Sequence, residues 1–159
     1  MLADFAFAQT LPPPGPLRIE LHASSVHVRM NDEIVLRVFF RSPGETTTIW
    51  NALWWGANSG LSLHVFDAAG REVPHTVTPI DPIPPDLTGK NALISIGGRA
   101  FAGFDSQFTT RELFPHPGSY KVMCVYRAPL RRDYFTGHRI WGKEDGAIES
   151  RRVSILVEK

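Results

Sequence analysis

The chain of 159 residues contains a single cysteine, Cys124. One cysteine cannot form an intrachain disulfide, and it cannot supply the several thiolates of a cysteine-based metal site. No apolar run approaches the roughly 18 residues of a membrane-spanning helix. We therefore expect a protein without a membrane span that is stabilised by packing, and its length is sufficient for one proper hydrophobic core.

An excess of charge of either sign is also missing. The chain has 17 basic and 16 acidic residues, so its formal net charge is +1. Because the charges nearly cancel, no overall electrostatic field attracts the protein to nucleic acid or to an anionic membrane. We therefore expect no nucleic-acid partner. The basic residues are 13 arginines and only 4 lysines. Because a planar guanidinium suits bidentate contacts, this bias is compatible with a local binding face.

The amino terminus carries only part of the pattern of a signal peptide. Ala6-Phe7-Ala8 has the form of a cleavage site, yet Met1 to Phe5 offer neither a basic region nor an adequate apolar one. Two interpretations stay open: a signal remnant, which would imply a secreted protein, or a free tail. Leu11 to Pro16 holds four prolines. We expect residues 1–16 to be extended or flexible and residues 17–159 to form one domain.

Short stretches in which apolar and polar side chains alternate recur along the chain with turn residues between them, which is typical of β-strands. They lie at 17–22, 26–29, 34–41, 46–55, 61–65, 71–73, 92–96, 101–108, 117–126 and 153–158. No helix longer than a turn or two is indicated. The pattern predicts an all-β protein, an antiparallel β-sandwich.

The stretch 117–126 is the expected central strand of this sandwich. One of its faces is continuously apolar and the other is mixed, as when one side meets the core and the other is partly covered. The apolar faces of the main strands are expected to form one core between two sheets. Its members are Ile34, Leu36, Val38, Phe40, Leu63, Val65, Tyr120, Val122, Cys124, Val153, Ile155 and Val157.

One long segment, Pro74 to Lys90, carries prolines at short intervals. A central strand does not tolerate so many missing N–H donors, so we expect a long loop on the outside of the sheets. Asp81 and Asp86 lie in it, but they are too few for a persuasive calcium site.

The residues from Pro117 onward resemble the carboxyl half of bacterial Ig-like sandwich domains. The likeness lies in Pro117-Gly118-Ser119-Tyr120-Lys121-Val122, Tyr126-Arg127, Trp141 near Gly142, Gly146-Ala147-Ile148-Glu149-Ser150, and Val153 to Val157. The segment from Leu130 to Arg139 is longer than the usual loop of that group. The resemblance implies an Ig-like fold and no particular activity.

Two residues take on expected roles from this resemblance. Tyr120 fits a corner tyrosine, whose ring caps the core and whose hydroxyl returns to the backbone near the start of the strand. Cys124 stands where an Ig domain has its second half-cystine, but the facing positions would be Leu36 or Val38. We therefore expect a buried and unreactive thiol.

A tryptophan cluster forms the first candidate binding site. Trp50, Trp54 and Trp55 lie close in sequence, and neighbouring residues on a strand point to opposite faces, so Trp54 and Trp55 cannot both be in the core. An outward indole can stack on a sugar ring or anchor a partner. The alternative is that the proline-rich loop covers it.

The second candidate site is the loop after the central strand, where basic and aromatic residues are interleaved. Such a loop can grip an anionic or flat group while rings stack on it. The alternative is a solvated loop with its tryptophan tucked into the sheet edge. Its candidate binding residues are Arg127, Arg131, Arg132, Tyr134, Phe135, Arg139 and Trp141.

Three further segments faintly resemble the binding loops of chagasin-type inhibitors of cysteine proteases, which are also Ig-like. They are Pro43 to Thr48, Ile96 to Arg99 and Arg127 to Pro129. The last lacks the aromatic residue of the inhibitor motif. The resemblance implies a protease inhibitor that inserts loops from one end of the sandwich.

No nucleophile elbow, phosphate-binding loop or close pair of histidines stands out, so we expect neither enzymatic activity nor a cofactor. The hypothesis is a binding module that recognises a protein partner, or a glycan, through loops at one end. A protease inhibitor and a purely structural accessory domain are the alternatives.

Overall fold

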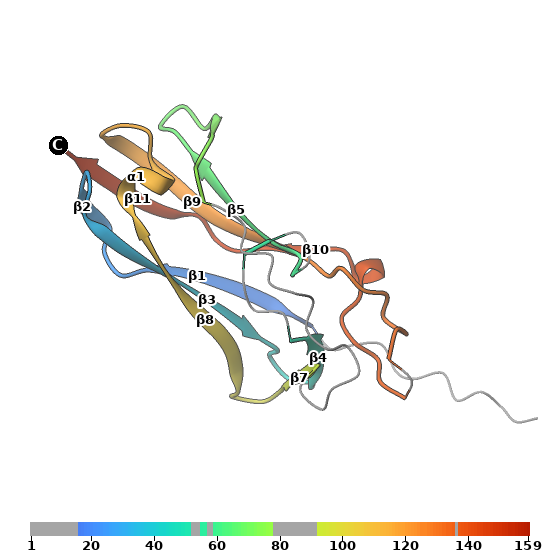
Figure 1. The fold of residues 1–159 in the computed structure, drawn as a ribbon. Helices are drawn as coiled ribbons and strands as arrows, with labels where there is room; N and C mark the ends of the chain where they lie inside the picture. Colours follow the sequence, from blue (N-terminus) through green and yellow to red (C-terminus); the bar gives the residue numbers. More distant parts are fainter. Residues whose placement is uncertain (1–15, 52–54, 57–58, 78–91, 136) are drawn as a thin grey trace, which may run out of the picture.

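The structure, a computed structural model, describes residues 16–51, 55–56, 59–77, 92–135 and 137–159. Two β-sheets lie face to face and their strands run along the long axis of the molecule (Figure 1). The first sheet has the order β1-β3-β8, with β1 (Arg18–Ala23), β3 (Glu33–Arg41) and β8 (Phe101–Thr109). All its pairings are antiparallel.

The second sheet has the order β2-β11-β9-β5-β6, with a short strand β10 also paired to β9. Its strands are β2 (His27–Arg29), β5 (Leu61–Phe66), β6 (Glu72–Val73), β9 (Gly118–Arg127), β10 (Ala147–Glu149) and β11 (Val153–Glu158). Only the pairing of β2 with β11 is parallel. The antiparallel all-β sandwich predicted from the sequence is confirmed.

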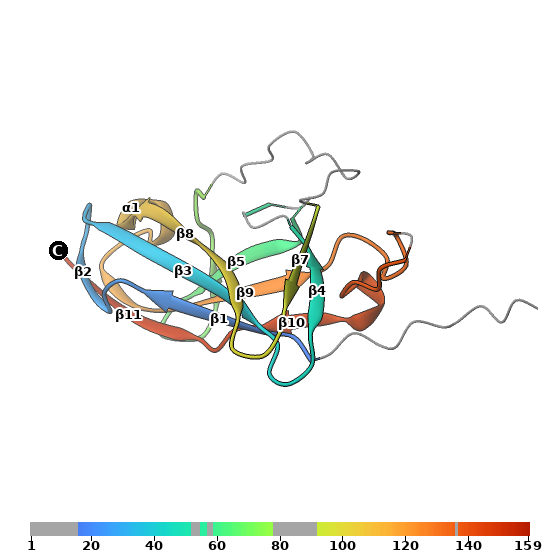
Figure 2. The ribbon, with the colours of Figure 1, turned by 90° about the horizontal axis from the view of Figure 1, so that it is seen from below.

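A third, two-stranded sheet closes one end. It pairs β4 (Thr47–Trp50) with β7 (Leu93–Ile96), and it stands across the ends of β3 and β8 (Figure 2). The predicted strand at 46–55 was too long, because β4 ends at Trp50. Among the described residues, helical structure is limited to α1 (Thr110–Leu113) and the 3-10 turn η1 (Lys143–Asp145), as expected. In the described part of the chain, no helix has the length and apolar character needed to cross a bilayer.

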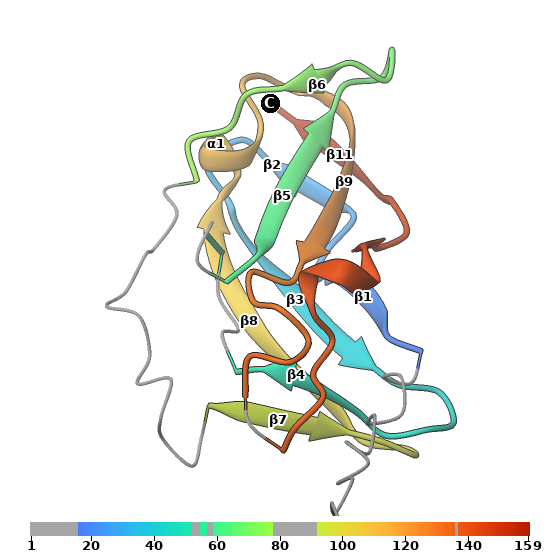
Figure 3. The same cartoon turned by 90° about the vertical axis from the view of Figure 1, so that its right-hand side faces the viewer.

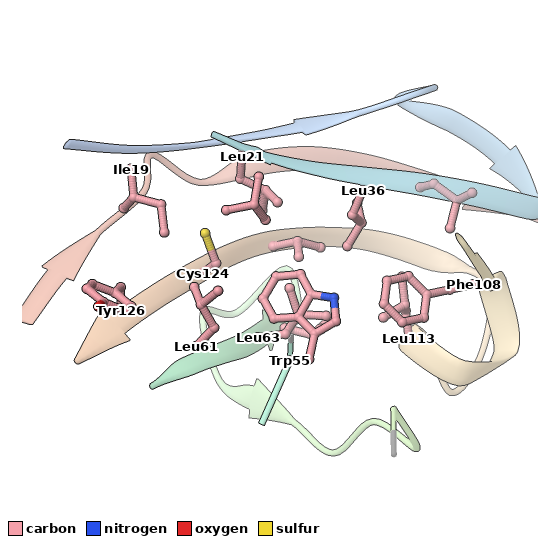
Figure 4. Packing of buried hydrophobic residues seen from close by; sticks show 14 of the residues in the cluster. Ile19, Leu21, Leu36, Trp55, Leu61, Leu63, Phe108, Leu113, Cys124 and Tyr126 are labelled. Carbon is pink, nitrogen blue, oxygen red and sulfur yellow. The ribbon is translucent and has the colours of Figure 1, made fainter. Parts of the chain in front are cut away.

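Side chains from the facing sheets interdigitate in one core (Figure 4). Every predicted core residue belongs to it, with Val153 as a half-buried member. Ile34, Leu36, Val38 and Phe40 are fully buried along the inner face of β3. This placement follows from the two-residue period of a strand, which puts alternate side chains on the same face.

Strand β9 is central, as predicted. Its outer face is also largely buried, because Met123 and Val125 are only 8% and 6% exposed. Arg152, just before β11, stacks its guanidinium 4.3 Å from the ring centroid of Phe66 on β5. Since β9 runs between those two strands, this cation–π contact spans its outer face.

Tyr120 adopts the expected corner position. Its ring is 3% exposed, and its hydroxyl donates a 2.8 Å hydrogen bond to the carbonyl oxygen of His116. The ring also packs against Phe114, with 4.8 Å between the centroids. The bond ties the turn that precedes β9 to the core.

Several expectations lie outside the described residues. They concern the amino-terminal segment up to residue 15, the proline-rich loop over 78–91 with Asp81 and Asp86, and Trp54.

The first prediction tests the corner bond. Tyr120→Phe removes the hydroxyl and leaves the His116 carbonyl without its donor, so it should lower the free energy of unfolding by about 1 kcal/mol in urea titrations. Tyr134→Phe is the matched control, because Tyr134 is half exposed and should be neutral. Equal effects of the two substitutions would contradict the structural role of Tyr120.

The second prediction concerns Cys124, which is fully buried. Burial raises the pKa of its thiol to about 11, partly opposed by a hydrogen bond with Ser150. The folded protein should resist Ellman's reagent at pH 8 and react at once in denaturant. Because the folded-state pKa lies above 9.0, the stability from holding this proton is full below pH 9 and is lost between pH 9 and about 11. Rapid labelling of the folded protein would contradict the buried position.

Candidate functional site

The loop after β9, which the sequence singled out, is anchored to the small end sheet. From the end of β9 the chain runs down to β4 and then turns back toward β10 (Figure 3). The N–H of Trp141 donates to the carbonyl oxygen of Thr48 on β4 at 2.8 Å. Ile140, beside it, is fully buried. This half of the loop therefore lies along β4 like an additional short strand.

Arg132 clamps the base of this loop. Its guanidinium Nη2 donates to Oδ1 of Asp145 at 2.6 Å, and its backbone N–H donates to Oε2 of Glu144 at 3.0 Å. The other carboxylate oxygen of Asp145 accepts the N–H of Gly142 at 2.8 Å. Gly142 is needed here, because a Cβ at this position would lie 2.2 Å from the backbone nitrogen of Arg132.

The clamp changes the acidity of Glu144. Its own backbone N–H, then the N–H of Arg132 and the charges of Arg131 and Arg132, hold the pKa of this carboxyl below its ordinary value. The carboxylate is therefore ionised at neutral pH and available to the clamp.

Three candidate residues of the loop, Arg131, Tyr134 and Phe135, keep all or part of their surface exposed. Tyr134 is 50% exposed, and its ring meets that of Phe135 edge-on with 5.2 Å between the centroids. The side chain of Arg131 is 63% exposed, with Nε 3.3 Å from Asp133 and 3.4 Å from Glu144. Exposed ion pairs of this kind contribute little to stability, so this guanidinium can exchange partners.

The remaining loop candidates are less open. Arg139 is half-buried, and Trp141 is half-buried and packs against the core. The position of Trp141 corresponds to the alternative in which this ring is tucked into the sheet edge. Arg132 likewise serves the loop's own structure.

Trp55 is buried in the sandwich. It is 7% exposed, and its indole N–H donates to Oγ of Ser106 on β8 at 2.9 Å. Figure 4 shows the indole among the core side chains near Leu63. Since the ring lies inside, Trp55 cannot be the outward tryptophan of the cluster.

One edge of Trp55 nevertheless lines a cavity, which we call the β5 pocket, of about 410 Å³. The same pocket is lined by Arg127, at the end of β9. The structure thus divides the candidate residues into an exposed set on the loop and a pair, Trp55 and Arg127, at a pocket.

His75 is a pocket residue that the sequence analysis did not single out. Its Nε2 donates to the carbonyl oxygen of Leu63 at 2.9 Å. The signal was present in the β5–β6 hairpin, in which Val65 pairs with Val73. Continuing this antiparallel register by two residues places His75 opposite Leu63.

No protein-family model and no curated protein matches the chain. Among the solved structures that are similar to it, two are each 12% identical in sequence. The sporulation control protein Spo0M from Bacillus subtilis gives a TM-score of 0.46 over 91% of this chain and 50% of its own, so this chain spans about half its length. The CARDB domain of the PF1109 protein from Pyrococcus furiosus, solved in complex with di-metal ions, gives 0.40 over 98% and 99%. Within the described residues of this chain, no three His, Cys, Asp or Glu side chains are grouped as metal ligands.

The third prediction tests the clamp. Asp145→Ala leaves the Gly142 N–H and the Arg132 guanidinium without their acceptor, so it should lower the free energy of unfolding by about 1–3 kcal/mol. Trypsin should also cleave faster after Arg131 or Arg132. The control Asp133→Ala removes an exposed carboxylate, and it should change the free energy of unfolding by no more than about 0.5 kcal/mol. An Asp145→Ala variant as stable and as resistant as the wild type would contradict the clamp.

Proposed function

We propose that this protein is a non-enzymatic module of Ig-like fold that binds a protein partner through the loop after β9. The observation that carries the proposal is a pair of rings on a loop fixed by internal hydrogen bonds: Tyr134 is exposed, and Phe135 beside it is partly exposed. Arg131 adds an exposed guanidinium beside them. Aromatic and arginine side chains are the residues that most often carry binding energy at protein interfaces.

The clamp supports this function through entropy. A flexible loop loses conformational freedom when it binds, and this loss weakens the complex. Here Arg132, Asp145 and the contact of Trp141 with β4 already order the loop. The exposed rings are therefore presented in a preorganised state, at a small further entropic cost.

The geometry of the rings favours a protein over a glycan. Their planes are 75° apart, so they do not form one flat platform for a sugar ring. Trp55, which the sequence offered as a sugar-stacking residue, is buried. Aromatic surface of this shape suits packing against an apolar side chain of a partner.

Two features support the Ig-like assignment. Tyr120 makes the corner bond to His116. In addition, the chain passes from one sheet to the other between β1 and β2, so that these two consecutive strands lie in different layers. Neither feature specifies a ligand.

The inhibitor alternative has one observation in its favour. The turns at 43–48 and 96–99 lie side by side, because Thr47 pairs with Ile96 and a Cβ on Gly97 would lie 2.3 Å from the Thr46 hydroxyl oxygen. The third segment, from Arg127 to Pro129, packs against Gly60 at the start of β5 instead. A loop-inserting inhibitor should titrate papain almost stoichiometrically, and activity unchanged by micromolar protein would eliminate this function.

The fourth prediction separates binding from stability. The triple substitution Arg131→Ala, Tyr134→Ala and Phe135→Ala removes the exposed set and keeps the clamp, so it should abolish capture of the partner from the native host while the melting temperature stays nearly unchanged. The control Arg99→Ala with Phe101→Ala removes an exposed cation and ring elsewhere, and it should capture normally. A triple variant that still captures the partner would exclude this loop as the interface.

A further inference from the structure

We propose that the β5 pocket binds a small, largely apolar molecule that carries one carboxylate. The pocket lies beside β5, between Trp55, the segment 75–77 and the end of β9. Its volume of about 410 Å³ falls in the range of small-molecule pockets in proteins. It is separate from the ring pair, Tyr134 and Phe135, on the loop after β9, which we call the recognition loop.

The walls of the pocket are apolar. They include Trp55, Leu61, Leu63 and Val77. Because the indole N–H of Trp55 already donates to Ser106, the tryptophan presents only its apolar surface to the pocket. Removing such surface from water is the main driving force for binding an apolar ligand.

His75 contributes a wall of the pocket. Its Nε2 donates to the carbonyl oxygen of Leu63, and its Nδ1 has no hydrogen-bond partner among the described residues. Because Nδ1 is buried beneath the surface, a ligand in the pocket does not reach it. The hydroxyl of Ser62 is also occupied, by Nε2 of His64 at 2.9 Å. Polar recognition in this pocket therefore depends on its remaining side chain, Arg127.

The backbone fixes Arg127 at the pocket. Its N–H donates to the carbonyl oxygen of Gly60 at 2.8 Å. Gly60 has a φ of +77°, and a Cβ there would lie 1.9 Å from the carbonyl oxygen of Arg127. Only glycine permits this close approach, which brings the end of β9 onto the start of β5.

The sign of the charge specifies the ligand class. Arg127 is the one guanidinium in the described lining, which contains no carboxylate. A guanidinium next to an apolar wall matches a carboxylate attached to an apolar body. The larger groove beside β1, of about 760 Å³, lacks this selectivity because Glu20 and Glu149 line it together with Arg18 and Arg151.

The test uses the full chain and two probes of the same shape, 3-phenylpropionate and its neutral amide. The carboxylate should bind saturably, and its ¹H–¹⁵N chemical-shift changes should concentrate on Gly56, Gly60, residues 61–63 and the indole N–H of Trp55. Arg127→Gln should weaken the carboxylate at least about three-fold and leave the amide unchanged, since the lost contact is a partly exposed charge pair. Arg151→Gln, in the other groove, is the matched control and should change neither affinity.

Three results would each overturn the inference. The first is no saturable binding of 3-phenylpropionate at millimolar concentration, and the second is chemical-shift changes centred away from the pocket. The third is an Arg127→Gln substitution that changes the affinities for the carboxylate and the amide by the same factor. The mapping uses the wild-type protein, so it does not depend on the folding of any variant. The triple variant of the recognition loop should bind 3-phenylpropionate normally, which separates this inference from the proposed function.

Discussion

Strand β9 is paired along both of its edges, and the positions of most other elements follow from that pairing. Strand β5 occupies one edge, while β11 and β10 share the other. Between β10 and β11 the ladder is interrupted, and Ser150 completes it: its Oγ accepts the N–H of Cys124, and its own N–H donates to the Cys124 carbonyl. The backbone N–H and C=O of Cys124 are therefore both hydrogen-bonded. A buried strand requires such pairing, because an unpaired buried backbone group is costly. A register slip of one residue would turn its core face outward.

The strands were predictable because their signal is local. In each strand, apolar residues at every second position form the buried face. This alternation of apolar and polar residues also predicted the core residues correctly. Strand ends were less predictable because pairing decides them. The strand predicted from the aromatic run continued to Trp55, but β4 stops at Trp50, opposite Leu93 at the start of β7. β10 was missed because its residues, Ala147-Ile148-Glu149, do not alternate between apolar and polar.

The candidate site shows a similar limit. Composition alone located the basic and aromatic loop, but it could not tell which arginines stabilise the loop and which remain exposed for binding. Arg131 and Arg132 are neighbours in the sequence, yet only Arg132 meets Asp145, 13 residues further on. Trp55 and Arg127 line the same pocket because β5 pairs with β9. No local sequence pattern predicts that these two residues lie close together.

The parallel pairing of β2 with β11 joins His27 to Leu156 and Arg29 to Glu158. These contacts connect the beginning of the described chain with its end. During synthesis on the ribosome, the edge formed by β2 must wait until residues 153–158 have emerged, although β2 itself left the exit tunnel long before. Such distant contacts slow folding, and until β11 arrives one edge of β9 stays open to pairing with other chains. Folding of this domain during synthesis can therefore be completed only after β11 has emerged.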